Sequence, residues 1–284
     1  MAQRSTVRRM TPLGVVLVVV LAAVATVWFG QRSQMYHPDR TTPPAAAQVL
    51  PGAQDVTFAT SDGLTLAAWY LPPTGSCDAT VLVAHGNGGN RAGRVGLARA
   101  IGDRGFGVLL LDYRGYGGNA GQPTEAGLAR DARAARAFLL EEQGVAPEGL
   151  IYLGESLGTG VVSALAVEHP PAAMVLRSPM TSFPDVVQAL YKVPVGWVWR
   201  DTYPVRDDVA QVTVPVAVVY GSGDTIVPPG QSREVAQAAR DGGAEVVEVE
   251  VPGANHNDAV LAEGADLTDA LVAVAELAGV TGCG

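Results

Sequence analysis

The sequence predicts an α/β protein with a mostly parallel central sheet and helices on both of its faces. Short runs that are apolar throughout, such as residues 80–84 and 150–153, recur along the chain. Such runs indicate strands that are buried on both faces, as in parallel sheets. Segments with helical periodicity separate these runs, and that alternation indicates crossover units of one sheet. The chain of 284 residues is long enough to build one large core.

The composition excludes two classes of protein. With 48% hydrophobic and 17% charged residues, the chain differs clearly from a disordered sequence. The formal net charge is -9 and the basic residues form no stripe, which argues against a nucleic acid partner. The basic residues form only one small group, at the N-terminus: Arg4, Arg8 and Arg9.

The first element is an apolar segment over residues 13–30. As a helix it would span roughly 25 Å, which approaches the thickness of the hydrocarbon core of a bilayer. We therefore expect a transmembrane signal anchor here, with residues 1–12 in the cytoplasm because basic residues favour that side. The rest of the chain would lie outside the cytoplasm. A cleaved signal peptide is the alternative, since Ala23-Val24-Ala25 fits a cleavage pattern, although Trp28 and Phe29 extend the apolar run beyond it.

A linker and a single domain are expected to follow. Residues 31–52 are rich in proline and alanine without periodicity, which predicts a linker. Ser61-Asp62-Gly63 lies between two β-like runs and predicts an antiparallel hairpin at the start of a domain over 53–280. Residues 281–284 are left as a tail. The hairpin brings the sheet to about eight strands, with the others expected at 80–84, 108–111, 150–153, 174–176, 214–220 and 246–251.

Helices are expected between these strands. Thr124 can cap a helix whose apolar residues then recur with helical spacing. The other helices are expected at 94–105, from Ser156 onward, at 232–240 and at 267–277. Ligands of such sheets bind beyond the carboxyl ends of the strands, so residues with catalytic chemistry should follow strands directly.

Ser156 follows one of these strands in the stretch GESLG. A serine that acts as a nucleophile must sit on a tight, strained turn with its hydroxyl exposed. Bulky residues beside it would clash with the neighbouring strand or helix, which explains Gly154 and Gly158. The alternative is an ordinary serine at the N-cap of a helix.

A serine hydroxyl needs a base, and that base needs an acid to orient it. Of the four histidines, only His256 combines a place after a strand with a place late in the chain. His37 lies in the predicted linker and His169 at a helix end. Asp224 follows another strand directly, whereas Asp258 is so close to His256 on one loop that it is better suited to capping. The order Ser156, Asp224, His256 is the order expected for a nucleophile-elbow triad.

Backbone N–H groups are predicted to form an oxyanion hole. The stretch VAHGNGGNR follows the strand at 80–84, and its glycines let the backbone approach a ligand closely. We assign the N–H of Asn87, with Gly88 as fallback, and the N–H of Leu157, which follows the nucleophile. A phosphate-binding loop is disfavoured because the stretch has no lysine. His85 is interpreted as a hydrogen-bonded structural residue.

Together, the stretches HGNGGN, DYRGYGGNAGQPTE, GESLGTG, GSGDTIVPP and GANHND resemble the α/β-hydrolase superfamily. More narrowly they are similar to its small membrane-anchored members, which are grouped with serine aminopeptidase-like and prolyl-oligopeptidase-like hydrolases. The resemblance covers about residues 56–280. It implies an α/β-hydrolase fold with Ser156 as nucleophile, Asp224 as acid and His256 as base. It also implies that Asp112, Arg114 and Tyr116 support the loop beside the site; Asn119 stands where relatives often have serine.

The expected activity is that of a membrane-anchored serine esterase or thioesterase. Ser156 would form an acyl-enzyme that water releases, and no metal or organic cofactor is expected. The alternatives are a serine exopeptidase or amidase, and a non-catalytic scaffold that has kept the fold. An exopeptidase would need a fixed carboxylate for the substrate amine, and Glu155 is the only candidate beside the serine.

Residues 178–209 separate two strands and are expected to form a lid. Its aromatic residues predict a substrate pocket for a small or lipid-like acyl group. An equally weighted alternative is that they only pack the lid onto the body. The residues assigned to this pocket are Phe183, Tyr191, Trp197 and Trp199.

The two cysteines, Cys77 and Cys283, are both expected at the amino edge of the sheet. Cys77 precedes the first parallel strand, and the last helix runs back to that edge before Cys283. A disulfide between them is geometrically possible in an oxidising compartment. Two free thiols are the alternative, because Cys283 lies in the tail.

Overall fold

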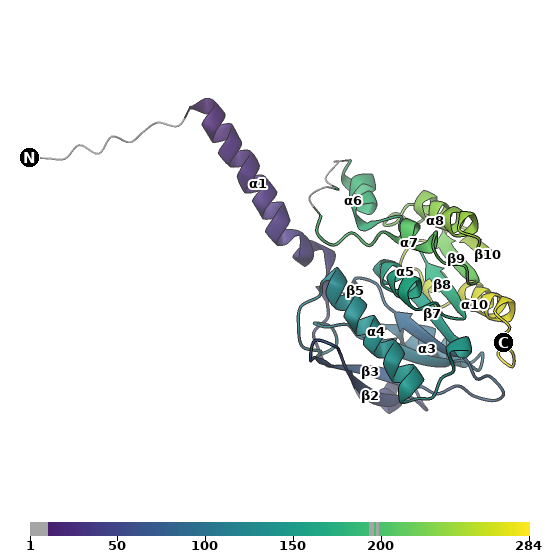
Figure 1. Cartoon of the computed structure of the whole chain (residues 1–284). Helices are drawn as coiled ribbons and strands as arrows, with labels where there is room; N and C mark the ends of the chain where they lie inside the picture. Colours follow the sequence, from purple (N-terminus) through teal and green to yellow (C-terminus); the bar gives the residue numbers. More distant parts are fainter. Residues whose placement is uncertain (1–10, 193–195, 197–198) are drawn as a thin grey trace, which may run out of the picture.

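A computed structural model describes residues 11–192, 196 and 199–284, and its centre is an eight-stranded sheet with helices on both faces (Figure 1). The strand order is β10-β9-β8-β7-β4-β6-β3-β2. β2 pairs antiparallel with β3, and β3 with β6, whereas the other neighbours are parallel. The predicted mixed sheet with its N-terminal hairpin is therefore confirmed. The strands are β2 Gln54–Ala59, β3 Thr65–Leu71, β4 Thr80–Ala84, β6 Gly107–Leu111, β7 Leu150–Glu155, β8 Ala173–Arg177, β9 Val216–Gly221 and β10 Val246–Val251.

The core consists of two apolar clusters, one on each face of the sheet. Side chains alternate along a strand, so Leu82 of β4 lies in one cluster while Val81 and Val83 lie in the other. The first cluster packs under α4 Glu125–Glu141, α5 Leu157–Glu168 and α8 Pro229–Asp241. The second packs under α3 Val95–Gly102, α9 Ala259–Ala262 and α10 Ala265–Leu277. Thr124 caps α4 as predicted, because its side chain accepts a hydrogen bond from the Gly127 N–H at 2.9 Å.

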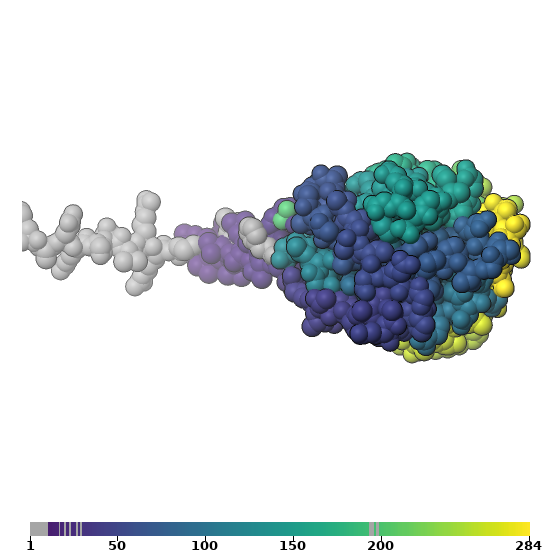
Figure 2. Space-filling view, turned by 90° about the horizontal axis from the view of Figure 1, so that it is seen from below, coloured from purple at the N-terminus to yellow at the C-terminus, as the bar shows by residue number. Residues whose placement is uncertain are grey.

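The apolar N-terminal segment forms a helix, α1 Pro12–Met35, whose first turns project away from the body (Figures 1 and 2). Several of its described side chains are exposed, including Val16 and Val19. The predicted transmembrane helix is not supported, since none of the described helices combines the length and the apolarity that a membrane crossing requires.

The segment 31–52, for which the sequence predicts a linker, packs on the domain in the structure. Met35 and Tyr36 are buried, and β1 His37–Pro38 pairs with β5 Gly88–Gly89 in a small parallel sheet. A short helix, α2 Ala46–Val49, follows, and it buries Ala46 beside β2. Backbone hydrogen bonds to a distant loop fix this segment, and a pattern of apolar residues cannot reveal such bonds.

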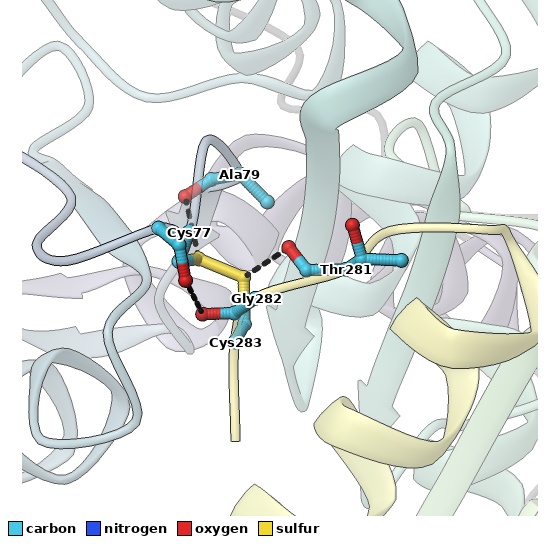
Figure 3. Close-up of a disulfide and its surroundings, with 6 residues drawn as sticks. Cys77, Ala79, Thr281, Gly282 and Cys283 are labelled. Atoms are coloured by element: carbon cyan, nitrogen blue, oxygen red, sulfur yellow. Dashed lines mark hydrogen bonds between the residues drawn. A yellow bond between two sulfur atoms is a disulfide. The ribbon is translucent and has the colours of Figure 1, made fainter.

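A disulfide joins Cys77 and Cys283, with their Cα atoms 4.7 Å apart (Figure 3). Cys77 precedes β4, and Cys283 follows α10 at the same edge of the sheet. The bond fixes the C-terminal tail, whose last N–H, at Gly284, also donates to the Arg104 carbonyl at 2.9 Å. The sequence left this pairing open, with two free thiols as the alternative, and the structure forms the disulfide.

Removal of the disulfide by Cys283→Ser is expected to lower the free energy of unfolding by about 2–5 kcal/mol, because the bond closes a long loop in the unfolded chain. The two cysteines are separated by 206 positions. Urea denaturation of the variant and the wild type checks this, and reduced wild type is the matched control. The reduced wild type should unfold at the same urea concentration as the variant. Equal midpoints for the variant and the oxidised wild type would contradict the prediction.

Candidate active site

Ser156 occupies a sharp turn between β7 and α5. Its backbone has φ 51° and ψ -115°, a strained conformation for a residue other than glycine. The turn is held because the Ser156 N–H donates to the Arg177 carbonyl at 2.9 Å, and the N–H and hydroxyl of Thr159 donate to the Ser156 carbonyl. The Ser156 side chain does not cap α5. The structure therefore disfavours the reading of Ser156 as an ordinary capping serine.

The glycines around Ser156 are required by close backbone contacts. A Cβ atom at Gly154 would lie 2.6 Å from the Cα atom of Thr159, and one at Gly158 would overlap the Ala84 carbonyl oxygen. A Cβ atom at Gly160 would lie 2.7 Å from the Cβ atom of Tyr203. The expectation that bulk would clash at Gly154 and Gly158 is confirmed.

His256 is paired with Asp224 at the carboxyl edge of the sheet. The imidazole Nδ1 lies 2.6 Å from Oδ2 of Asp224, while the N–H groups of Ile226 and Val227 donate to Oδ1. Burial alone would raise the pKa of Asp224, but the hydrogen bond and charge of His256 and the two N–H groups outweigh it and lower this pKa. The carboxylate thus stays charged and holds Nδ1–H, which leaves Nε2 as the basic nitrogen. Asp258 is exposed and accepts from the Asn255 N–H instead.

Ser156 and His256 line one cavity of about 330 Å³. The structure therefore brings together the three residues that the sequence assigned to catalysis: Ser156, His256, and Asp224 behind the imidazole. The cavity is lined by Gly86, Asn87, Gly88, Arg94, Ser156, Arg177, Ile226, His256 and Asn257.

The two backbone N–H groups assigned to the oxyanion hole belong to the loop after β4 and to the start of α5. Leu157 is the first residue of α5, where helix N–H groups have no partner within the helix. Within the described part of the chain, neither this N–H nor that of Asn87 has an acceptor. Asn87 is held from three sides. Its carbonyl accepts from the His37 N–H and the Tyr116 hydroxyl, and its Nδ2 donates to the Met35 carbonyl at 2.9 Å.

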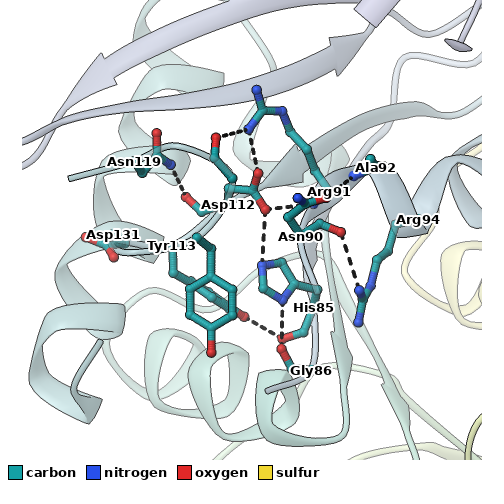
Figure 4. A network of polar contacts seen from close by, with 12 residues as sticks. His85, Gly86, Asn90, Arg91, Ala92, Arg94, Asp112, Tyr113, Asn119 and Asp131 are labelled. Atoms are coloured by element: carbon teal, nitrogen blue, oxygen red, sulfur yellow. Dashed lines mark hydrogen bonds and ion pairs between the residues drawn. The ribbon is translucent and has the colours of Figure 1, made fainter. Parts of the chain in front are cut away.

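A buried polar network supports this loop from behind (Figure 4). His85 is 1% exposed and packs against the rings of Tyr113 and Tyr116. Its Nδ1 lies 2.7 Å from the Gly86 carbonyl and its Nε2 lies 3.3 Å from Asp112. Asp112 also accepts from the backbone and side chain of Arg91. The structural interpretation of His85 is confirmed, as is the supporting role of Asp112 and Tyr116.

Arg114 and Asn119 support the same region. Arg114 pairs with Asp131 and Asp62, in agreement with its predicted structural role. Asn119 exchanges two hydrogen bonds with the backbone of Ala67 and donates a third to the Asp112 carbonyl. The departure from serine at this position therefore ties the loop to strand β3.

Asn87→Ala is expected to lower kcat by about threefold to tenfold, since the loss of one hydrogen bond is typically worth about 1 kcal/mol. The variant keeps the N–H but loses the bond that ties the loop to Met35. Steady-state kinetics on one ester substrate checks this. Asn257→Ala is the control, because Asn257 lines the same cavity and makes no hydrogen bond among the described residues. An equal loss in both variants would argue against a positioning role of the Asn87 side chain.

Glu155 connects three loops of the site. It is 3% exposed, and its carboxylate lies 3.0 Å from Nε of Arg94 and 3.5 Å from Nη2 of Arg177. Arg94 in turn donates to the Gly88 carbonyl, and Arg177 donates to the His256 carbonyl at 2.8 Å. Burial would raise the pKa of Glu155, but the charges of Arg177 and Arg94 outweigh it and lower this pKa. The residue before the nucleophile thus joins the turn to both neighbouring loops.

Sequence reasoning missed the roles of Arg94 and Arg177. Arg94 was placed at the start of an ordinary helix, and Arg177 lies at the end of β8 without any recognised motif. The signal that was available is weak: an arginine at the end of a buried strand in such a sheet points to the edge where ligands bind.

Of the predicted aromatic pocket, Phe183, Tyr191 and Trp199 are described by the structure, and none of these three lines the cavity. Phe183, at the start of α6 Phe183–Tyr191, packs edge-on against Trp199 with ring centroids 5.0 Å apart, and both contact the core. Tyr191 is 71% exposed, and Trp197 lies outside the described residues. For Phe183 and Trp199 the structure favours the alternative that they pack the segment 178–209 onto the body. α7 Val205–Val209 completes this segment.

Comparisons with known proteins place these features in one family. The sequence profile of the family "Serine aminopeptidase, S33" matches residues 75–206. An uncharacterized protein of Mycobacterium tuberculosis is 44% identical over 269 residues, which cover 93% of this chain and 95% of that protein. The human alpha/beta hydrolase domain-containing protein 17B is 29% identical, over 71% of this chain and 68% of its own.

Solved structures show the same fold. An esterase from Pyrococcus furiosus superposes with a TM-score of 0.68 at 18% sequence identity, and the match covers 86% of this chain and 97% of that one. At 18% sequence identity, this likeness shows a shared fold and nothing about the reaction.

Proposed function

The chain belongs to the serine aminopeptidase-like (S33) family of the α/β-hydrolase superfamily, and we propose that it is a serine hydrolase acting on carboxylic esters or thioesters. One observation carries the proposal: Ser156 sits on a strained turn and shares a cavity with a histidine that is hydrogen-bonded to a buried aspartate. A non-catalytic scaffold would not need to retain the backbone strain at Ser156.

The proposed reaction follows from the placement of these groups. His256 takes the proton from the Ser156 hydroxyl at Nε2 while the serine oxygen attacks the carbonyl carbon. The N–H groups of Asn87 and Leu157 stabilise the negative charge that develops on the carbonyl oxygen. His256 then gives its proton to the leaving group, and water, activated by the same imidazole, releases the acid from Ser156.

Esters suit the cavity better than aminoacyl substrates. An aminopeptidase needs a carboxylate that is free to bind the substrate amine, but Glu155 is already paired with two arginines. Among the described residues, those that line the cavity include no aspartate or glutamate. The volume of about 330 Å³ is near the lower end for ligand pockets and favours small esters over long lipids.

A substrate panel tests this proposal. 4-Nitrophenyl esters of increasing chain length are compared with aminoacyl 4-nitroanilides under the same conditions. We expect hydrolysis of short esters and little hydrolysis of the anilides. Faster hydrolysis of the anilides would favour the exopeptidase alternative instead.

We further propose that the catalytic domain works outside the cytoplasm, attached to a membrane through α1. The disulfide supports an oxidising compartment, and the exposed apolar side chains of α1 support contact with lipid. Fractionation of the native host tests the location. Recovery of the protein in the cytoplasmic fraction, with both thiols free, would contradict it.

A further inference from the structure

We infer that the active-site cavity selects esters that carry a second, anionic group, a carboxylate or a phosphate, which Arg94 binds beside Ser156. This inference rests on the hydrolase function proposed above and specifies its substrate class. It follows from the charge of the cavity wall, from the unused donors of Arg94 and from the place of this side chain.

The wall of the cavity carries an excess of positive charge. Arg94 and Arg177 both line it, whereas Glu155 lies behind them and is not among the lining residues. One carboxylate cannot neutralise two guanidinium groups, and Asp224 is already paired with His256. The side chain of Arg94 is 18% exposed, so its charge is accessible from the cavity.

Arg94 has hydrogen-bond donors to spare. Its Nε donates to Glu155 and its Nη1 donates to the carbonyls of Gly88 and Asn90. Its Nη2 has no acceptor among the described residues. A guanidinium that is fixed on two nitrogens and open on the third is pre-organised to bind one oxygen of a carboxylate or phosphate. In Figure 4 the Arg94 guanidinium extends from the start of the helix toward the loop that holds Gly86.

The free end of Arg94 lies close to the nucleophile. A Cβ atom built on Gly86 would be 3.9 Å from Nη2 of Arg94 and 3.6 Å from the Cβ atom of Ser156. Gly86 therefore leaves room between the serine and the guanidinium. An ester bound to Ser156 can reach Arg94 with a short anionic arm, on either its acyl or its alcohol side.

Arg177 adds to the positive potential without competing for the ligand. It is 5% exposed and donates to the His256 carbonyl, so it is held in place behind the imidazole loop. Its Nε is buried and has no partner among the described residues. The unused donor that remains for a ligand is therefore Nη2 of Arg94, whereas the unpartnered Nε of Arg177 is buried.

Two pairs of esters test the inference. The mono-4-nitrophenyl ester of adipic acid is compared with its methyl ester, which has no charge on the acyl side. A monobutyryl glycerol phosphate is compared with monobutyryl glycerol, which has no charge on the alcohol side. We expect kcat/KM of the wild type to be at least about tenfold higher for the anionic member of one pair, the size of a charge-assisted hydrogen bond. The preference should fall as salt is added.

Variants of Arg94 assign the preference. Arg94→Gln should bring the anionic-to-neutral ratio close to one, and Arg94→Lys should keep part of it. The ratio is taken within each enzyme, so a general loss of activity in a variant does not affect the result. The anionic-to-neutral ratio of the wild type and its dependence on salt can be measured even if neither Arg94 variant folds.

The outcomes separate this inference from the proposed function. Hydrolysis of both members of each pair at equal kcat/KM, or a preference that survives Arg94→Gln, would overturn the inference and leave the hydrolase intact. A wild type that hydrolyses none of the four esters would overturn both.

Discussion

Replacement of Ser156 by alanine is expected to lower ester hydrolysis by about 10⁴-fold or more, because the reaction then has no nucleophile to form an acyl-enzyme. Residual activity would come from the oxyanion hole and from binding alone. The substitution removes one hydroxyl of a residue that lines the cavity and whose side chain does not cap α5, so the fold should be preserved. Steady-state kinetics with a short 4-nitrophenyl ester, together with a thermal melt, measures both effects.

Ser163→Ala is the matched control for this variant. Ser163 is a buried serine of α5, and its hydroxyl has no hydrogen-bond partner among the described residues. Alanine favours the helix, so this variant should keep wild-type activity and stability. Retention of activity in Ser156→Ala would show that another group attacks the ester.

Asp224→Asn is expected to lower kcat by about 10³- to 10⁴-fold with little effect on KM, because an amide does not hold the imidazole in the required tautomer. At present the Asp224 carboxylate lies 2.6 Å from Nδ1 of His256 and its low pKa keeps it charged. Asparagine keeps the size of the side chain and removes the charge. The variant therefore isolates the orienting role of the acid.

Asp258→Asn distinguishes between the two acids near His256. Asp258 is exposed, and within the described part of the chain its carboxylate accepts only from the Asn255 N–H, so its variant should stay within about threefold of the wild type, the effect of a weak surface interaction. The kinetic constants of both variants are measured on the same ester. A larger loss of kcat for Asp258→Asn than for Asp224→Asn would mean that Asp258, and not Asp224, is the acid that orients His256.

The strands of the sheet could be predicted because the residues within each strand are enough to identify it. Strands β4 and β10 were predicted with the bounds that the structure has, since each is a short apolar or β-branched run. Thr124 could be assigned as a cap for the same reason. The segment from Met35 to α2 could not be predicted, because its structure depends on bonds to Asn87 and Gly89, which are distant in the sequence.

The site was predictable where a residue both has distinctive chemistry and follows a strand. Ser156, Asp224 and His256 meet that condition. Glu155 stood out only by its place beside the serine, and its function depends on two arginines that come from other strands and helices. Arginine is common on surfaces, so Arg94 carries no signal until the fold shows that this residue lines the cavity. For the aromatic residues of 178–209, a substrate pocket and packing onto the body stayed equally weighted, because composition cannot tell a pocket wall from a packing contact.

The central claim is that Ser156 is the nucleophile, and labelling with a fluorophosphonate tests it most directly. The probe phosphonylates a serine only where a base and an oxyanion hole activate it. Peptide mapping by mass spectrometry locates the adduct after reaction with the full chain. The account predicts a single adduct on Ser156 in the wild type and none in Ser156→Ala. An unlabelled wild type, or an adduct on another serine, would contradict it.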